Sequence, residues 1–281
     1  MRKIGAHVSA AGGLHKAIEN AKKIGANTIQ IFGSSPRQWS VKLPDKKQAD
    51  LFKEEIKKSG INPIFLHAPY LVNIATPDDV IRNKSIDNLI GQMKIAELIG
   101  AEGVIFHIGT RKDLKIKEAL KKCSEAIKII LKKVPGKSKI LIENNAGEGK
   151  KVGTTPEEIG IIIKQVKSDR VGICIDTAHS FESGIIDEYT PQKVKSFFDT
   201  WGKEVGKNKI VVLHINDSKT LAHSHHDRHE NIGQGHIGLK GFQNLAKDKR
   251  VNNIPWILEV PGFTNEGPDK KNINLLKSLF K

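Results

Sequence analysis

Histidines and carboxylates stand at the ends of six short apolar segments of the chain. The segments are IFLH ending at His67, VIFH at His107, LIE at Glu143, ICID at Asp176, VLH at His214 and WILE at Glu259. A single histidine at such a position is most often a hydrogen-bonded structural residue. A carboxylate that follows Ile and Leu, however, is costly to bury unless it is paired or bound to a metal. Six such endings together predict a shared metal site.

Three more potential ligands lie close to this set. His179 follows Asp176 by three residues, and the segment DRH adds Asp227 and His229, which point the same way if the segment is extended. The nine candidates are five histidines and four carboxylates, without a thiolate. Such mixed ligation favours Zn, Mn or Fe over a structural Cys-based zinc site. Nine ligands exceed the need of one ion, so we expect two or three ions.

The charge of the chain indicates the class of substrate. Its 46 Lys and Arg residues outnumber 31 Asp and Glu residues, which gives a formal net charge of +15. Such a protein attracts polyanions, although an excess of solvated lysine that serves only solubility would give the same net charge. Three divalent ions with four carboxylates would leave the site at about +2, and ions about 3.5 to 4 Å apart favour displacement at phosphorus. We therefore predict phosphodiester hydrolysis.

The elements that must position these side chains follow from periodicity. Short β-branched segments alternate with longer amphipathic ones, as is typical of parallel βα units. We predict eight strands, at residues 3–8, 28–32, 64–67, 103–108, 139–143, 171–176, 210–215 and 256–260. Helices are expected at 78–99, 114–134 and 156–166, the last with Thr155 as N-cap and Pro156 as its first residue. Eight units in 281 residues predict an α/β fold, a (β/α)8 TIM barrel, as a single domain over residues 1–281.

Other signals narrow the setting. A doubly wound sheet would show a phosphate-binding glycine fingerprint after its first strand, where the chain has only Gly12-Gly13. Residues 218–238 are polar and rich in histidine, which indicates a functional or mobile loop. Cys123 and Cys174 are too few for a disulfide framework, and no apolar run is long enough for a signal peptide or a membrane span. We expect a cytoplasmic protein without a membrane partner.

Three stretches resemble the signatures of the endonuclease IV family of apurinic/apyrimidinic (AP) endonucleases. They are HAPYLVNIA at 67–75, VGICIDTAH at 171–179, and HINDSK at 214–219 together with DRHENIGQGHIG at 227–238. GAHVSAAGG at 5–13 and PRQW at 36–39 are also similar, so the resemblance covers essentially the whole chain. It implies a TIM barrel that hydrolyses the DNA backbone 5′ to an abasic site, leaving a 3′-hydroxyl and a 5′-deoxyribose phosphate, in base excision repair.

The resemblance also implies a trinuclear zinc site, with manganese as an alternative in part of it. The nine candidates would be divided among three ions as His67, His107 and Glu143; Glu143, Asp176, His214 and Glu259; and His179, Asp227 and His229. Glu143, which bridges two ions, and Glu259 are the implied catalytic residues.

Recognition of the damage requires other side chains. In the family, residues of the loops after the second and third strands enter the base stack, and the matching positions are Arg37, Tyr70 and Leu71. An abasic nucleotide has lost its stacking energy, so extruding it costs less than flipping a normal one. Arg228 would contact a phosphate or orient a ligand carboxylate. The expected partner is duplex DNA with abasic sites, bound by a monomer; the alternative for these side chains is ordinary packing or surface charge.

Two alternative functions and one question about the ligands stay open. A divalent-metal sugar isomerase or epimerase barrel would explain Glu143, Asp176, His214 and Glu259, but neither the other ligands nor the charge. A non-catalytic nucleic-acid-binding protein would explain only the charge. The extra histidines His223, His225 and His226 depart from the family pattern, as does Ala178, where Cys is common. They leave a tenth ligand open.

Overall fold

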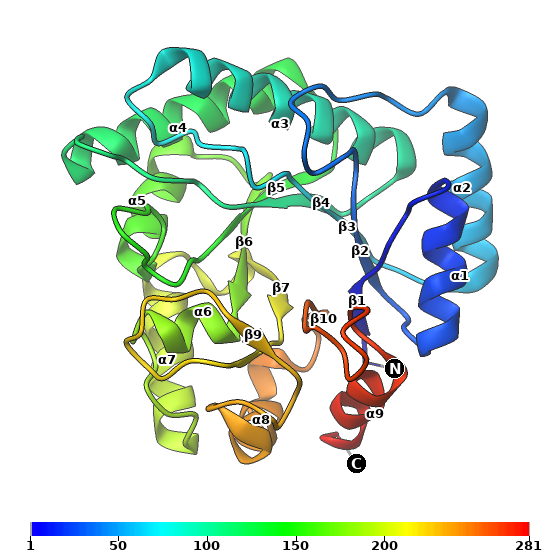
Figure 1. Cartoon of the computed structure of the whole chain (residues 1–281). Helices are drawn as coiled ribbons and strands as arrows, with labels where there is room; N and C mark the ends of the chain where they lie inside the picture. The colour runs from blue at the N-terminus through cyan, green and yellow to red at the C-terminus, as the bar shows by residue number, and fades with distance from the viewer. Residues whose placement is uncertain (1, 281) are drawn as a thin grey trace.

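Eight parallel strands close into a barrel in the computed structural model of the chain, which describes residues 2–280 (Figure 1). In sequence order the strands are β1 (Ile4–His7), β2 (Ile29–Phe32), β3 (Ile64–His67), β4 (Gly103–Phe106), β5 (Lys139–Glu143), β6 (Val171–Asp176), β7 (Ile210–His214) and β10 (Trp256–Leu258). The barrel closes where Ile4 of β1 lies in register with Trp256 of β10. The predicted (β/α)8 barrel is confirmed, with every strand end within two residues of its predicted position.

Helices surround the barrel and connect its strands (Figure 1). They are α1 (Leu14–Ile24), α2 (Lys46–Ser59), α3 (Asp79–Ile99), α4 (Ile116–Lys133), α5 (Pro156–Val166), α6 (Thr177–Glu182), α7 (Pro191–Glu204), α8 (Gly238–Ala246) and α9 (Lys270–Ser278), with short 3-10 turns η1 (Lys207–Lys209) and η2 (Lys249–Val251). Helix α5 begins as predicted. The Thr155 side chain accepts a hydrogen bond from the backbone N–H of Glu158, and Pro156, which has no backbone N–H, stands at the first position, where the helix uses none. Within residues 2–280, no helix is long and apolar enough to cross a membrane.

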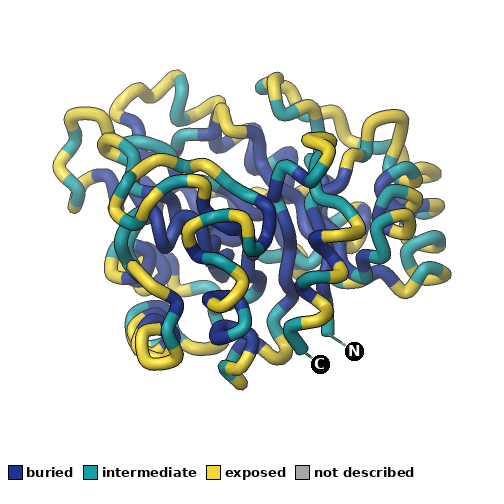
Figure 2. The backbone as a smooth tube through the Cα atoms, turned by 60° about the horizontal axis from the view of Figure 1, so that its bottom comes forward, coloured by how far each residue is buried: buried dark blue, intermediate teal, exposed yellow. Residues whose placement is uncertain are grey.

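The core has two parts. Buried segments of the chain are dark blue in the interior of the molecule (Figure 2). The larger part lies between the strands and the surrounding helices. The smaller part fills the barrel interior with Phe65, Ile105, Leu141, Cys174, Val212 and Ile257. This interior layer forms the floor beneath the predicted ligands.

The His-rich segment contains a small sheet that periodicity did not predict. Strand β8 (Asp217–Ser218) pairs antiparallel with β9 (His229–Glu230). The buried Asp217 carboxylate holds the end of the segment, because it accepts hydrogen bonds from the backbone N–H groups of Gly233, Gly235 and Ile237 at 2.9 to 3.0 Å. The segment is therefore a fixed part of the barrel mouth.

Candidate metal centre

The alternation of side chains along each strand places six predicted ligands in one layer. Each of them lies two positions after one of the six residues that fill the barrel interior, so both point to the same side of the strand. His67, Glu143, Asp176 and His214 end their strands, whereas His107 and Glu259 follow the last residue of β4 and β10. The ligands therefore form a polar layer directly above the apolar floor.

Glu143 lies at the centre of this layer and is completely buried. Its Oε2 is 3.1 Å from Nε2 of His67 and 3.5 Å from Nε2 of His107. Its Oε1 is 2.8 Å from Nδ1 of His214, on the other side. The two oxygens of one carboxylate thus face two different groups of histidines.

A second group forms around His214, which is also completely buried. Its Nδ1 lies 3.1 Å from Oε2 of Glu259 and 3.8 Å from Oδ2 of Asp176, in addition to its contact with Glu143. These four residues offer one ligand atom each, and those atoms lie within 4.8 Å of one another. Cys174 lies nearby, but burial raises the pKa of its thiol to about 12, so it stays protonated.

The third group joins helix α6 to the His-rich segment. Nε2 of His179 is 3.2 Å from Oδ1 of Asp227 and 3.3 Å from Nε2 of His229. The carboxylate of Asp176 reaches this group as well, with Oδ2 3.7 Å from Nε2 of His229. Asp176 is also the N-cap of α6, because its side chain accepts a hydrogen bond from the backbone N–H of His179. The structure brings together all nine predicted ligands in overlapping groups, in which Asp176 joins His179 and His229 as well as His214 and Glu259.

Neighbouring polar groups orient several of these ligands. Nδ1 of His67 lies 2.7 Å from the Ala68 carbonyl, and Nδ1 of His179 lies 2.9 Å from the Asn144 carbonyl. A carbonyl only accepts hydrogen bonds, so each Nδ1 carries a proton, and each Nε2, which faces a carboxylate, is the nitrogen that an ion would bind. Asn216 donates to Oδ2 of Asp176 at 2.7 Å. These contacts prepare the ring nitrogens to bind a cation.

The electrostatics of the centre favour cations. Among the described residues, the four carboxylates form ion pairs with histidines and with no Lys or Arg. Burial opposes the charge of Glu143, yet His214 and His107 hold the pKa of this carboxyl well below its usual range. Burial likewise opposes a charge on His179, but Asp176 and Asp227 hold its pKa well above the usual value. Protons on the histidines thus balance the carboxylates, and divalent ions would take their place.

His107 is the exception among the ligands. Burial lowers the pKa of His107 to about 4, so its imidazole is neutral at physiological pH. Its Nδ1 is buried without a hydrogen-bond partner, while Nε2 faces Glu143. A neutral imidazole beside a buried carboxylate suits the nitrogen and oxygen preference of zinc. The residues present therefore fit the metal set that the sequence predicted.

The predicted DNA-contact residues divide into two pairs. Tyr70 and Arg228 line a cleft of about 310 Å³ together with the ligands. Tyr70 is 71% exposed, and its ring centroid is 5.8 Å from that of His67. Arg37 and Leu71 are exposed but lie outside the lining of this cleft. The guanidinium of Arg228 donates to the backbone carbonyl of Asp227 at 2.8 Å.

Four residues of the centre were not predicted from the sequence. Glu148 lines the cleft and accepts a hydrogen bond from the backbone N–H of Asp227. Glu182 of α6 accepts from the backbone N–H of Arg228, and its second oxygen is buried without a partner. The other two are His7 and Gln30, which contact Glu259. His7 ends the first strand, so the strand-end rule that found the other ligands could have found it.

The extra histidines of the loop lie outside the ligand groups. Within residues 2–280, His223, His225 and His226 belong to none of the clusters that could hold an ion. His225 instead lies with Nδ1 3.2 Å from the backbone carbonyl of Ala146. They supply no tenth ligand in this structure.

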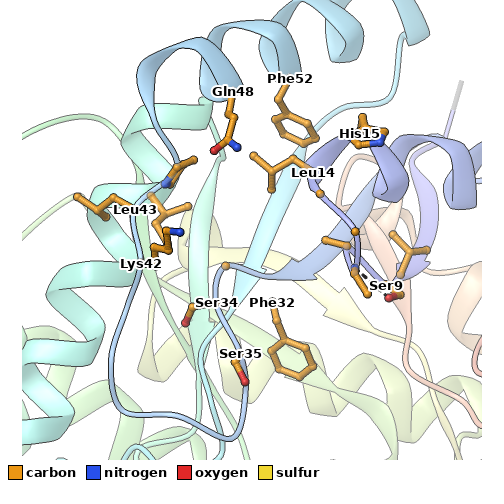
Figure 3. A pocket seen from close by; sticks show the side chains of 18 of the residues that line it. Ser9, Leu14, His15, Phe32, Ser34, Ser35, Lys42, Leu43, Gln48 and Phe52 are labelled. Atoms are coloured by element: carbon orange, nitrogen blue, oxygen red, sulfur yellow. Dashed lines mark hydrogen bonds between the residues drawn. The ribbon is translucent and has the colours of Figure 1, made fainter.

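A larger hollow of about 710 Å³ lies beside the cleft, between the loops after β1 and β2 and helix α2 (Figure 3). Its walls include Leu14, Leu43 and Phe52, so it is largely apolar. Phe32 lines it as well, with its ring centroid 4.4 Å from that of His7. Phe32 thus separates the apolar hollow from the polar layer of histidines.

The fold and the ligand layer define a class of protein. Residues 18–279 match the family described as "Xylose isomerase-like TIM barrel", to which the chain belongs. Within this class the chain is 37% identical to the "Probable endonuclease 4" of Persephonella marina over 284 residues, which cover 100% of this chain and 98% of that protein. The chain therefore belongs to the endonuclease IV family of enzymes, as its sequence motifs indicate.

Solved structures agree with this assignment. The crystal structure of endonuclease IV from Thermus thermophilus superposes with a TM-score of 0.85 and 29% identity, over 99% of this chain and 98% of that one. A D-tagatose 3-epimerase-like protein superposes with a TM-score of 0.74 but only 20% identity, covering 98% and 96%. The epimerase-like protein shares the fold alone.

Proposed function

We propose that the protein is a zinc-dependent AP endonuclease. It hydrolyses the phosphodiester bond 5′ to an abasic site in duplex DNA, leaving a 3′-hydroxyl and a 5′-deoxyribose phosphate, as a step of base excision repair. It would act as a monomer in the reducing cytoplasm, associated with the nucleoid. Both cysteines are buried and free, which is consistent with a reducing compartment.

One observation carries the proposal: four carboxylates and five histidines meet in three overlapping groups. Glu143 and Asp176 each belong to more than one group, so neighbouring ions would share ligands and lie close together. Closely spaced divalent ions supply a nucleophile at neutral pH and clamp the attacking and leaving oxygens of an in-line displacement at phosphorus. A single-ion barrel would have no use for the third group, formed by His179, Asp227 and His229.

The nine candidate ligands would be shared among three ions. His67, His107 and Glu143 would hold one ion, and Glu143 would share its other oxygen with the group of His214 and Glu259. The remaining group, joined by Asp176, would hold the third ion. Manganese is a substitute that these nitrogen and oxygen donors accept.

Recognition would use the exposed rim of the cleft. Tyr70 is exposed and lines the cleft, so its ring would stack in the gap left by the missing base, and Leu71 follows it in the same loop. Arg228 and Arg37 carry positive charge toward phosphates. Extrusion of an abasic nucleotide loses less stacking energy than extrusion of an intact one, which gives the site its selectivity.

The test uses a labelled duplex with one abasic analogue and the protein as purified. We expect about three zinc equivalents per chain, cleavage 5′ to the lesion, and loss of cleavage after prolonged chelation. Glu259→Gln should lower the rate constant by orders of magnitude and leave binding of the abasic duplex near normal, because the ligand acts on the transition state far more than on the ground state.

Two outcomes would contradict the proposal. Full cleavage by protein shown to be metal-free would exclude the metal mechanism. A stoichiometry of one ion, with no cleavage of the abasic duplex, would favour sugar isomerisation or epimerisation by a barrel of the same fold.

A further inference from the structure

Gln30 is a completely buried glutamine in the middle of β2, and its carboxamide reaches into the ligand layer. Its Oε1 lies 2.8 Å from Nε2 of His214. Its Nε2 lies 2.5 Å from Oε1 of Glu259 and 2.9 Å from Nδ1 of His7. Gln30 pairs in register with His7 of the neighbouring strand β1, so the two side chains share the inner face of the barrel. One carboxamide therefore contacts two of the proposed ligands.

The chemistry of the partners fixes the orientation of this carboxamide. An ionised carboxylate only accepts hydrogen bonds, so the group that faces Glu259 must be the N–H2 of Gln30. The oxygen of Gln30 then faces His214 and must accept a hydrogen bond from the Nε2–H group of that ring. The second N–H of Gln30 is directed to Nδ1 of His7, which accepts it. Both N–H bonds and the oxygen of Gln30 thus have partners.

This arrangement decides which atoms of the ligands remain free. With one proton fixed on Nε2, Nδ1 of His214 is the nitrogen that an ion would bind, and it faces Glu143 and Glu259 at 2.8 and 3.1 Å. With Oε1 of Glu259 held by Gln30, its Oε2 remains on the side of His214. Both free atoms belong to the same group of candidate ligands.

We propose that Gln30 is a positioning residue that sets the tautomer of His214 and the rotation of the Glu259 carboxylate for one shared ion. The inference rests on the proposed metal centre and adds a residue that is not itself a ligand. Partners of this kind typically change metal affinity by about 10- to 100-fold when they are removed. Gln30 differs from the usual single partner because it orients two ligands at once.

The chain offers a matched control for a purely structural role. Gln92 of α3 is also completely buried, and its Nε2 donates to Oγ of Ser34 at 2.8 Å. Its carboxamide has no hydrogen bond to any candidate ligand. Replacement of either glutamine by methionine conserves most of the volume and removes the polar contacts. A difference between the two variants therefore reports on positioning.

The experiment measures zinc release from the holoenzyme to an excess of a chromogenic chelator. Gln30→Met should release one of its zinc ions about 10- to 100-fold faster than the wild-type protein, while the other ions are released at nearly the wild-type rate. Gln92→Met should release all of its zinc at the wild-type rate. Gln30→Glu, which retains an oxygen toward His214 but places a carboxylate against Glu259, should also accelerate release.

The outcomes separate this inference from the proposed function. Release from Gln30→Met at the wild-type rate, or equal acceleration in Gln92→Met, would overturn the positioning role. If Gln30→Met does not fold, Gln30→Glu decides by the same measurement. Wild-type protein that binds no zinc would overturn the proposed function itself.

Discussion

At the scale of single residues, Glu143 is shared by two of the groups that could hold an ion. One of its oxygens faces His67 and His107, and the other faces His214. A buried carboxylate without cationic partners would be strongly destabilising. Burial opposes a charge on His67 and His214, but neighbouring groups, Glu143 among them, raise the pKa of both rings, so their protons balance the carboxylate and ions would replace them. The same residue thus explains both the stability of the layer and its demand for metal.

Tyr70→Ala tests recognition separately from chemistry. The ring is mostly exposed, and it lies beside the rings of His67 and Phe32, with centroids 5.8 and 6.1 Å away. Loss of one stacking aromatic should weaken binding of the abasic duplex by about 1 to 3 kcal/mol. Zinc content should stay unchanged, because Tyr70 donates no ligand. Binding titrations and metal analysis measure the two effects.

The control for this variant is Ile129→Ala, which shortens a partly exposed side chain on the outer helix α4. Its affinity for the abasic duplex should equal that of the wild-type protein. Loss of zinc from Tyr70→Ala, or full preference for abasic over intact duplex in that variant, would remove Tyr70 from damage recognition.

The sequence predicts the ligands better than it predicts the residues that orient them. A carboxylate at the end of an apolar strand, such as Glu143 or Asp176, is conspicuous because burial is costly for it. A glutamine within a strand, such as Gln30, has no such signal, since amides occur both buried and exposed. Its role depends on the distance between β2 and β7 across the barrel, which only the closed structure defines.

At the scale of elements, the His-rich segment brings two candidate ligands, Asp227 and His229, beside His179. Asp217 fixes the end of this segment through backbone N–H groups on residues 233–238, and β9 carries His229. Glu148 and Glu182 hold the backbone at Asp227 and Arg228 from two other elements. The position of the ligands in this segment therefore depends on anchors outside the cleft.

Asp217→Asn should loosen this segment. The new N–H2 group would face N–H donors, and a buried donor left without a partner costs about 1 to 3 kcal/mol. We expect a decrease of that size in the free energy of unfolding, measured with urea, and faster release of one zinc ion. Asp169→Asn, a change at a fully exposed carboxylate, should alter stability by less than about 0.5 kcal/mol. Equal stability of the two variants would show that Asp217 does not anchor the segment.

The barrel strands and the helices with clear periodicity or caps were predictable, whereas the short elements of the barrel mouth were not. The bounds of β3, β5, β6 and α5 match the sequence prediction, because alternation and the cap at Thr155 are strong local signals. Helix α6 has six residues, and β8 and β9 have two each, so none is long enough to show a period. Tertiary contacts, such as those of Asp217, determine these short elements instead.

At the scale of the whole molecule, the barrel collects its chemistry on one face. All eight strands run parallel, so their carboxyl ends, with the ligands, meet at one end of the barrel. α9 packs beside β1 and α1, which completes the ring of helices (Figure 1). A polyanionic substrate therefore has one face to approach, and the net charge of +15 acts over a longer range than the cleft itself.

The salt dependence of binding tests whether the positively charged side chains contact the phosphates of DNA. Lysines and arginines that contact phosphates displace condensed counterions, so binding to undamaged duplex should weaken log-linearly with salt, with a slope of magnitude about 4 or more. Arg228→Gln and Arg37→Gln should each lower the slope by about 1 if their side chains contact phosphate. Lys128→Gln, on the exposed side of α4, removes the same charge away from the cleft and should leave the slope unchanged. Fluorescence anisotropy over a salt series measures all four proteins, and a flat response of the wild-type protein would mean that its excess charge is only a solvated surface.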